Sequence, residues 1–405
     1  MTMRVRMAVI TALAIGLAVC LGPAAAAADA APWAAAAGPV GTDTTVAGIE
    51  IPQGPLTEVE ELLRNLQREL GVDLPKLGVR DVIGMIRGTG DGPNLRALGS
   101  ALAAYFAREV VVNLHLLGRL VALMALLGVL TALRTSFGSE SVARAAYLVT
   151  AVVLAGLAIS GLRTGVEATR GHIQLTVDFM RAILPVLLSL LIGVGAVVTA
   201  GLFSPWMLFA TYFIASVSSG VVVPLVIVAA ACEIVSTLGG EIKVTAAASV
   251  CRQIAITVLG VSMTVFLGVM TVQSAAGSVA DGVAMRTGKF LATSFIPIIG
   301  KMFGDAFEMV IGGSLVLKNA VGIAGAIAVF VITALPALKV GALVLIYRIA
   351  AALAEPIAGP QIVACLDGIA NCLGLMLLAV CGTGLAWFVS IVMIMGAGNA
   401  AVMMR

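Results

Sequence analysis

Three charged residues at helical spacing are the best candidates in this sequence for chemistry inside an otherwise apolar region. Lys301, Asp305 and Glu308 would lie within about 60° on one face of a helix, and Lys301 can pair with Asp305 across one turn. If that helix lies at membrane depth, the charges must face a partner or a water-filled cavity. If it lies at the membrane surface, they form a solvated face. Both interpretations stay open at this point.

The other polar residues point away from enzyme and metal chemistry. Arg348 and Glu355 also share a helix face, and we expect both side chains to reach toward a nearby membrane boundary. The two histidines, His115 and His172, are far apart in the chain, and the sequence contains no H-E-x-x-H, G-x-S-x-G or Walker A motif. We therefore predict that the chain is not an enzyme and needs no metal or cofactor.

The elements that position these residues must be membrane helices, because the composition excludes a soluble fold. Of the 405 residues, 60% are hydrophobic and only 11% are charged, whereas soluble chains are about 25% charged. A water-soluble fold could not hide this much apolar surface, so the chain is expected to be embedded in a lipid bilayer. The net charge of +3 gives no concentrated basic face, so we expect no nucleic-acid partner.

Long apolar segments mark where the helices cross the bilayer. At about 20 residues per crossing, they predict about seven spans, with a range of six to eight. The charge-free run 182–232 is long enough for two spans, divided at Phe203–Pro205. The stretch 319–354 contains Pro336 and is either a hairpin of two short helices or one long kinked helix. The candidate segments are 110–133, 145–162, 182–232, 253–280, 319–338, 340–347 and 368–404.

Two further stretches are amphipathic rather than uniformly apolar. Within Arg163–Arg181, polar side chains alternate with apolar ones at Glu167, Arg170, Gln174 and Asp178. The stretch Val279–Leu317 is similarly mixed. Such segments lie in the membrane interface, re-enter the membrane or line a bundle interior. The predicted fold is therefore an all-α polytopic membrane helix bundle with interfacial or re-entrant amphipathic helices.

The first part of the chain has the pattern of an exported segment. Residues 1–28 combine two arginines, a short apolar run and an alanine-rich end, which is typical of a signal peptide; an uncleaved signal anchor is the alternative. We interpret residues 29–108 as a polar, non-cytosolic segment and residues 109–405 as the multi-span membrane domain.

Within the polar segment, the spacing of leucines predicts an amphipathic helix over residues 56–70. Leu62 and Leu66 lie on its apolar face. That face either packs on its own protein or on the membrane surface, or docks a partner.

A family resemblance lies in the central part of the chain. The carrying blocks are FMRAILPVLLSLL at 179–191, KFLATSFIPIIGKMFGDA at 289–306 and IGGSLVLKNAVG at 311–322. Together they resemble the stage III sporulation protein AE family of endospore-forming bacteria. The total length, the leading signal and the late string of apolar spans are also similar to that family.

The resemblance implies a membrane protein of the mother cell that faces the forespore during sporulation. Family members are thought to join a secretion-like channel complex that links the two cells and sustains the forespore and its late gene expression. Its implied partners are the other stage III A proteins, including an ATPase, and the forespore's stage II protein Q. The alternative function is a secondary transporter, or permease, for an unknown small solute, which the proline-interrupted 319–354 stretch favours.

Overall fold

The structure is a computed structural model of the chain, and it describes residues 45–46, 49–50, 95–137, 140–238, 244–295 and 299–403. Nearly all of these residues are helical. A pair of two-residue strands, β1 (Thr45–Val46) and β2 (Ile49–Glu50), precedes the helices and is antiparallel. The helical elements are α4 (Leu95–Phe137), α5 (Glu140–Gly193), α6 (Val197–Val217), the π-helical turn η2 (Ser218–Val222), α7 (Val223–Leu238), α8 (Thr245–Phe295), α9 (Ile299–Ala354) and α10 (Pro360–Met403).

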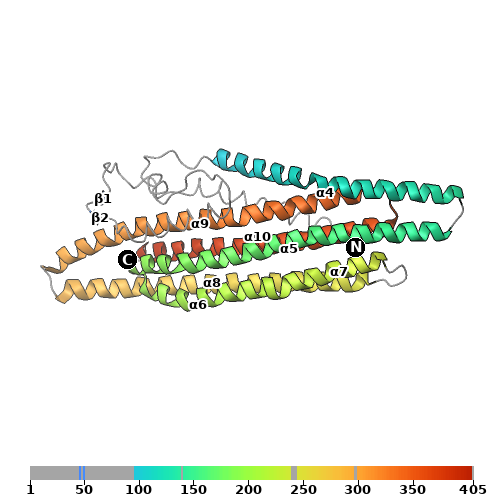
Figure 1. Cartoon of the computed structure of the whole chain (residues 1–405). Helices are drawn as coiled ribbons and strands as arrows, with labels where there is room; N and C mark the ends of the chain where they lie inside the picture. The colour runs from blue at the N-terminus through green and yellow to red at the C-terminus, as the bar shows by residue number, and fades with distance from the viewer. Residues whose placement is uncertain are drawn as a thin grey trace.

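The helices lie side by side along one long axis (Figure 1). Helices α9, α10 and α5 form the centre, α4 covers one side, and α6, α7 and α8 cover the opposite side. Helix α9 has 56 residues and is therefore about 84 Å long, whereas the hydrocarbon core of a bilayer is about 30 Å thick. The bundle is thus considerably longer than a membrane is thick.

Within the described residues, six helical segments are long and apolar enough to span a membrane, and each has 28 to 46 residues. Six lies within the predicted range of six to eight. The segments are Gly99–Leu126, Leu148–Gly193, Val197–Thr237, Thr245–Thr287, Ile311–Ala354 and Pro360–Ala400. The all-α membrane bundle predicted from the composition is therefore confirmed.

The predicted division at Phe203–Pro205 is wrong. Helix α6 continues through Pro205, and the chain reverses direction earlier, between Gly193 and Val197. Gly195 provides that reversal with a φ of 90°, a conformation that L side chains rarely adopt. At the other proline, Pro336, the structure shows one continuous helix, α9, so the single long helix is the correct alternative.

An aspartate from another helix closes the turn between α5 and α6. Asp281 of α8 is 1% exposed. Its two carboxylate oxygens accept hydrogen bonds from the backbone N–H groups of Val198 (2.7 Å) and Thr199 (2.9 Å). These N–H groups belong to the first turn of α6, where a helix has no internal acceptors for them. The carboxylate therefore completes the start of α6 and attaches it to α8.

The two amphipathic stretches are not separate elements. Residues 163–181 lie inside α5, and residues 279–317 are divided between the end of α8 and the start of α9. The predicted limit of the membrane domain at residue 109 lies inside α4. Residues 1–28 and the helix predicted over 56–70 lie outside the described residues.

Two hydrophobic clusters follow one another along the bundle. One gathers around Phe203 and Trp387, and the other around Leu120 and Tyr347. Buried threonines occur between them, including Thr383 of α10. The long helices therefore share two apolar cores with a polar level in the middle.

Candidate functional site

The predicted polar triad lies on a single helix. Lys301, Asp305 and Glu308 all belong to the first turns of α9, as their spacing predicted. Their side chains lie outside the described residues, and so do Leu62 and Leu66 of the predicted docking helix. Both sets therefore remain predictions, and the described site is built from other charges in the bundle.

The first of these charges form an ion pair between α7 and α8. An Nη atom of Arg252 donates to Glu233 at 2.5 Å, and the side chains are only 20% and 7% exposed, respectively. The backbone carbonyl of Glu233 also accepts a hydrogen bond from the Thr237 hydroxyl at 3.0 Å. A carboxylate this deeply buried needs its cation, because an unpaired charge in the interior is very unfavourable.

A second polar network joins α9 to α10. Arg348 donates from its two Nη atoms to Asp367 (2.8 Å) and to Asn371 (2.6 Å). The expectation that Arg348 and Glu355 both extend toward the membrane boundary is therefore wrong for Arg348. Its side chain is 27% exposed and turns inward, because a carboxylate on the neighbouring helix satisfies it. Glu355 lies exposed just after the end of α9.

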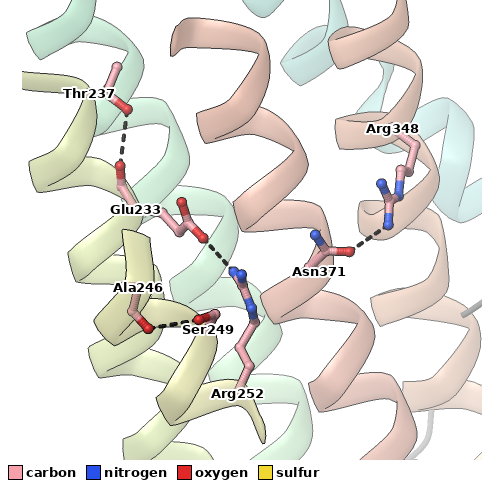
Figure 2. A network of polar contacts seen from close by, with 7 residues as sticks. All are labelled: Glu233, Thr237, Ala246, Ser249, Arg252, Arg348 and Asn371. Carbon is pink, nitrogen blue, oxygen red and sulfur yellow. Dashed lines mark hydrogen bonds and ion pairs between the residues drawn. The ribbon is translucent and has the colours of Figure 1, made fainter. Parts of the chain in front are cut away.

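Both networks meet on the same part of α10 (Figure 2). Asn371 faces Arg348, while Gly368 faces the opposite network. A Cβ atom added at Gly368 would lie 2.6 Å from Cδ of Glu233, so only glycine lets α10 approach that carboxylate. Two acids and two arginines thus form one electrically neutral polar layer across α7, α8, α9 and α10. We call these four residues with Asn371 the charged layer.

A buried histidine marks the middle of the bundle. His172 of α5 is 1% exposed. Its Nδ1 lies 3.2 Å from the Ile332 carbonyl of α9, and its Nε2 lies 3.1 Å from the Thr383 hydroxyl of α10. A carbonyl only accepts hydrogen bonds. The ring therefore donates from Nδ1 to the Ile332 carbonyl, and its contact with the Thr383 hydroxyl, which itself donates to the Ala379 carbonyl, joins α5 to α9 and α10.

A buried lysine connects α9 and α10 near the other end of the bundle. Lys318 is fully buried. Its Nζ donates to the Met395 carbonyl at 2.8 Å and to Oδ1 of Asn399 at 3.0 Å. Both acceptors are neutral and belong to the last turns of α10. A Cβ at Gly398 would collide with Nζ, so glycine again makes room for a charge.

The polar side chains of this arrangement attach neighbouring helices to one another. Among the described residues, no group of three or more His, Cys, Asp or Glu side chains could hold a metal ion. The five cysteines in the described part of the chain form no disulfide bond with one another. The charged layer, His172 and Lys318 each use their polar atoms to hold neighbouring helices together. Neighbouring helices are thus attached to α10 at three levels along its length.

Sequence reasoning missed most of these residues, although part of the signal was present. Glu233 and Lys318 are single charges beside long apolar runs, and such charges at membrane depth are expected to have a partner. Their partners could not be identified, because Arg252 and Asn399 become neighbours only through the packing of separate helices. His172 was noted only for its distance from His115 along the chain.

The six apolar helices and their interior charge pairs define a polytopic α-helical membrane protein. Residues 79–398 match the family described as Stage III sporulation protein AE (spore_III_AE), and the chain belongs to that family. It is 38% identical over 305 residues to the Stage III sporulation protein AE of Bacillus subtilis (strain 168), which covers 75% of this chain and 76% of that relative. No solved structure is a significant match. The resemblance in the central blocks is thereby confirmed, and it supports a role in sporulation.

Proposed function

We propose that this chain is a structural, conduit-forming component of a secretion-like sporulation complex in the mother-cell membrane facing the forespore. The observation that carries the proposal is the family match, which runs from before α4 to the last turns of α10 and so covers the bundle. The buried charges agree with a structural role, because each described one is used to attach helices. In the complex, the chain would sustain the forespore and its late gene expression.

The proposed partners are the other stage III A proteins, including an ATPase, and the forespore's stage II protein Q. We assign no catalytic role to this chain, so any step driven by ATP would belong to a partner. The candidate docking surface for these partners is the face of Leu62 and Leu66. The polar triad of Lys301, Asp305 and Glu308 is the candidate polar face within the membrane.

A secondary transporter remains the second candidate, and the start of α6, at the reversal after α5, is the helix N-terminus to consider as a substrate site. In transporters, the N-terminus of a broken helix commonly binds an anionic group of the substrate. Here the first N–H groups of α6 already bind Asp281. The N-terminus of α6 is thus occupied by the protein's own carboxylate, which makes the transporter the weaker proposal.

The deciding experiment is a gentle detergent pull-down of the tagged protein from sporulating cells, with mass spectrometry of the recovered proteins. We expect the other stage III A proteins at defined stoichiometry. Recovery of this chain alone, as a monodisperse monomer or small oligomer, would contradict the complex and make solute-uptake assays the next step.

The polar triad is tested separately by changing Lys301, Asp305 and Glu308 to alanine. If they line a functional interior, sporulation fails while the protein remains inserted and abundant. Normal sporulation would show that the triad is only a solvated face.

A further inference from the structure

Helix α5 carries a line of polar side chains on its outer surface, and the functions above do not use it. The residues follow one another at intervals of three or four, so they share one face of the helix. All are exposed in the structure. We call this set the α5 stripe; it consists of Arg163, Glu167, Arg170, Gln174, Asp178 and Arg181.

The stripe lies at the level of charge-free segments of α9 and α10. His172, on the opposite face of the same turns of α5, contacts Ile332 of α9 and Thr383 of α10. These two contacts lie in the charge-free runs 319–338 and 368–404. Toward the end of the stripe, the guanidinium of Arg181 lies 4.8 Å from the centre of the Tyr212 ring. The stripe extends over 19 residues, or about 27 Å, which is close to the thickness of the hydrocarbon core.

Four of the five charges of the stripe are paired along their own helix. Arg163 pairs with Glu167 at 2.7 Å, and these side chains are 78% and 63% exposed. Gln174 donates to Asp178 at 2.9 Å, and Arg181 lies 3.4 Å from the other oxygen of the same carboxylate. They differ in this from the charged layer, whose members reach across to other helices. The stripe is therefore a polar, exposed face that lies within the membrane region.

Lipid tails cannot solvate such a face. Ionisable residues within spanning segments face a bundle interior or a water-filled cavity, because hydrocarbon offers them no hydrogen bonds. Helix α8 shows the alternative on this same molecule: its outward residues include Val261, Val265 and Val272, all more than half exposed. The α8 face suits lipid, and the α5 stripe needs water.

We propose that the α5 stripe lines a water-filled path across the membrane that is closed by further copies of this chain. The inference rests on the proposed conduit function, and it identifies the α5 stripe as the wall of the conduit. All copies insert in the same direction, so direct contact between two stripes would place each charge against its own like charge. Copies arranged around water avoid that repulsion, because four of the five charges are already paired within each helix and all are screened from the next copy by water and salt. The path would admit small hydrophilic solutes.

Cysteine labelling tests the aqueous path in the full chain, with its native cysteines changed to alanine. Gln174→Cys tests the stripe. Val265→Cys is the control at similar depth, because the adjacent Phe266 packs on Trp387, one turn from Thr383. Membranes are treated with a charged, membrane-impermeant methanethiosulfonate. We expect Gln174→Cys to react at least about tenfold faster than Val265→Cys. Equal rates would overturn the proposal; Arg170→Cys replaces Gln174→Cys if that variant is not produced.

Cross-linking identifies what closes the path. With a bifunctional maleimide, Gln174→Cys should give a covalent dimer of this chain, whereas Val265→Cys should not. An adduct with a different protein, and none with a second copy, would refute closure by copies of the chain. The pull-down separates the two proposals: stage III A partners recovered with an unreactive Gln174→Cys would leave the complex intact and remove the α5 stripe from the conduit.

Discussion

Loss of Arg252 should destabilise the bundle strongly, because it leaves Glu233 charged and buried. The carboxylate is 7% exposed and has Arg252 as its cation. Removing one partner of a buried pair costs roughly 3–5 kcal/mol. We expect Arg252→Met to lower the free energy of unfolding by about 3 kcal/mol, since the guanidinium is itself 20% exposed and water can partly replace it. That change corresponds to about a hundredfold shift in the unfolding equilibrium.

The matched control is the exposed pair on α5. Arg163 and Glu167 are 78% and 63% exposed, so Arg163→Met should cost far less stability than Arg252→Met. The double variant Glu233→Leu with Arg252→Met should recover most of the loss, because no unpaired charge remains. Each variant is unfolded in detergent by titration with sodium dodecyl sulfate, followed by tryptophan fluorescence. The reasoning is refuted if Arg252→Met costs no more than Arg163→Met, or if the double variant is less stable than Arg252→Met alone.

Three further changes test the close approaches in the fold by the same titration. Gly368→Ala should lower stability, because its Cβ would lie 2.6 Å from Cδ of Glu233; Gly201→Ala, with nothing within 4 Å, should be neutral or slightly stabilising, and equal losses would contradict the contact. Gly195→Ala should cost about 1–2 kcal/mol, because its φ of 90° is left-handed; an unchanged midpoint would show that the turn relaxes. Asp281→Ala should cost about 0.5–2 kcal/mol through the lost cap, and no loss would mean that water caps α6 equally well.

The sequence was sufficient for the class of fold, because composition and run length depend only on the chain itself. It failed at the reversal between α5 and α6. Pro205 was the visible helix breaker, yet a proline in a long apolar helix is tolerated where neighbouring helices support it. Gly195 and the carboxylate of Asp281 determine the reversal instead. The contact with Asp281 joins residues more than eighty positions apart, which spacing along the chain could not reveal.

The site was less predictable than the fold for the same reason. Arg348 was grouped with Glu355 on one helix face and expected to reach the membrane boundary, because helical spacing is the one geometry that a sequence provides directly. The structure pairs it with Asp367 across a helix interface. The stretch that became the α5 stripe was recognised as amphipathic, with the lining of a bundle interior among its options. Its outward direction required knowledge of which face of α5 packs on α9 and α10.

Helix α10 is fixed at three heights: by Arg348 near its start, by His172 in the middle and by Lys318 near its end. A helix held in this way cannot rotate or slide without breaking all three attachments at once. A force applied to the bundle at one membrane surface would therefore reach the other surface with little loss, as through a rigid strut. Movement during function should then be sought as tilting of whole subunits relative to one another.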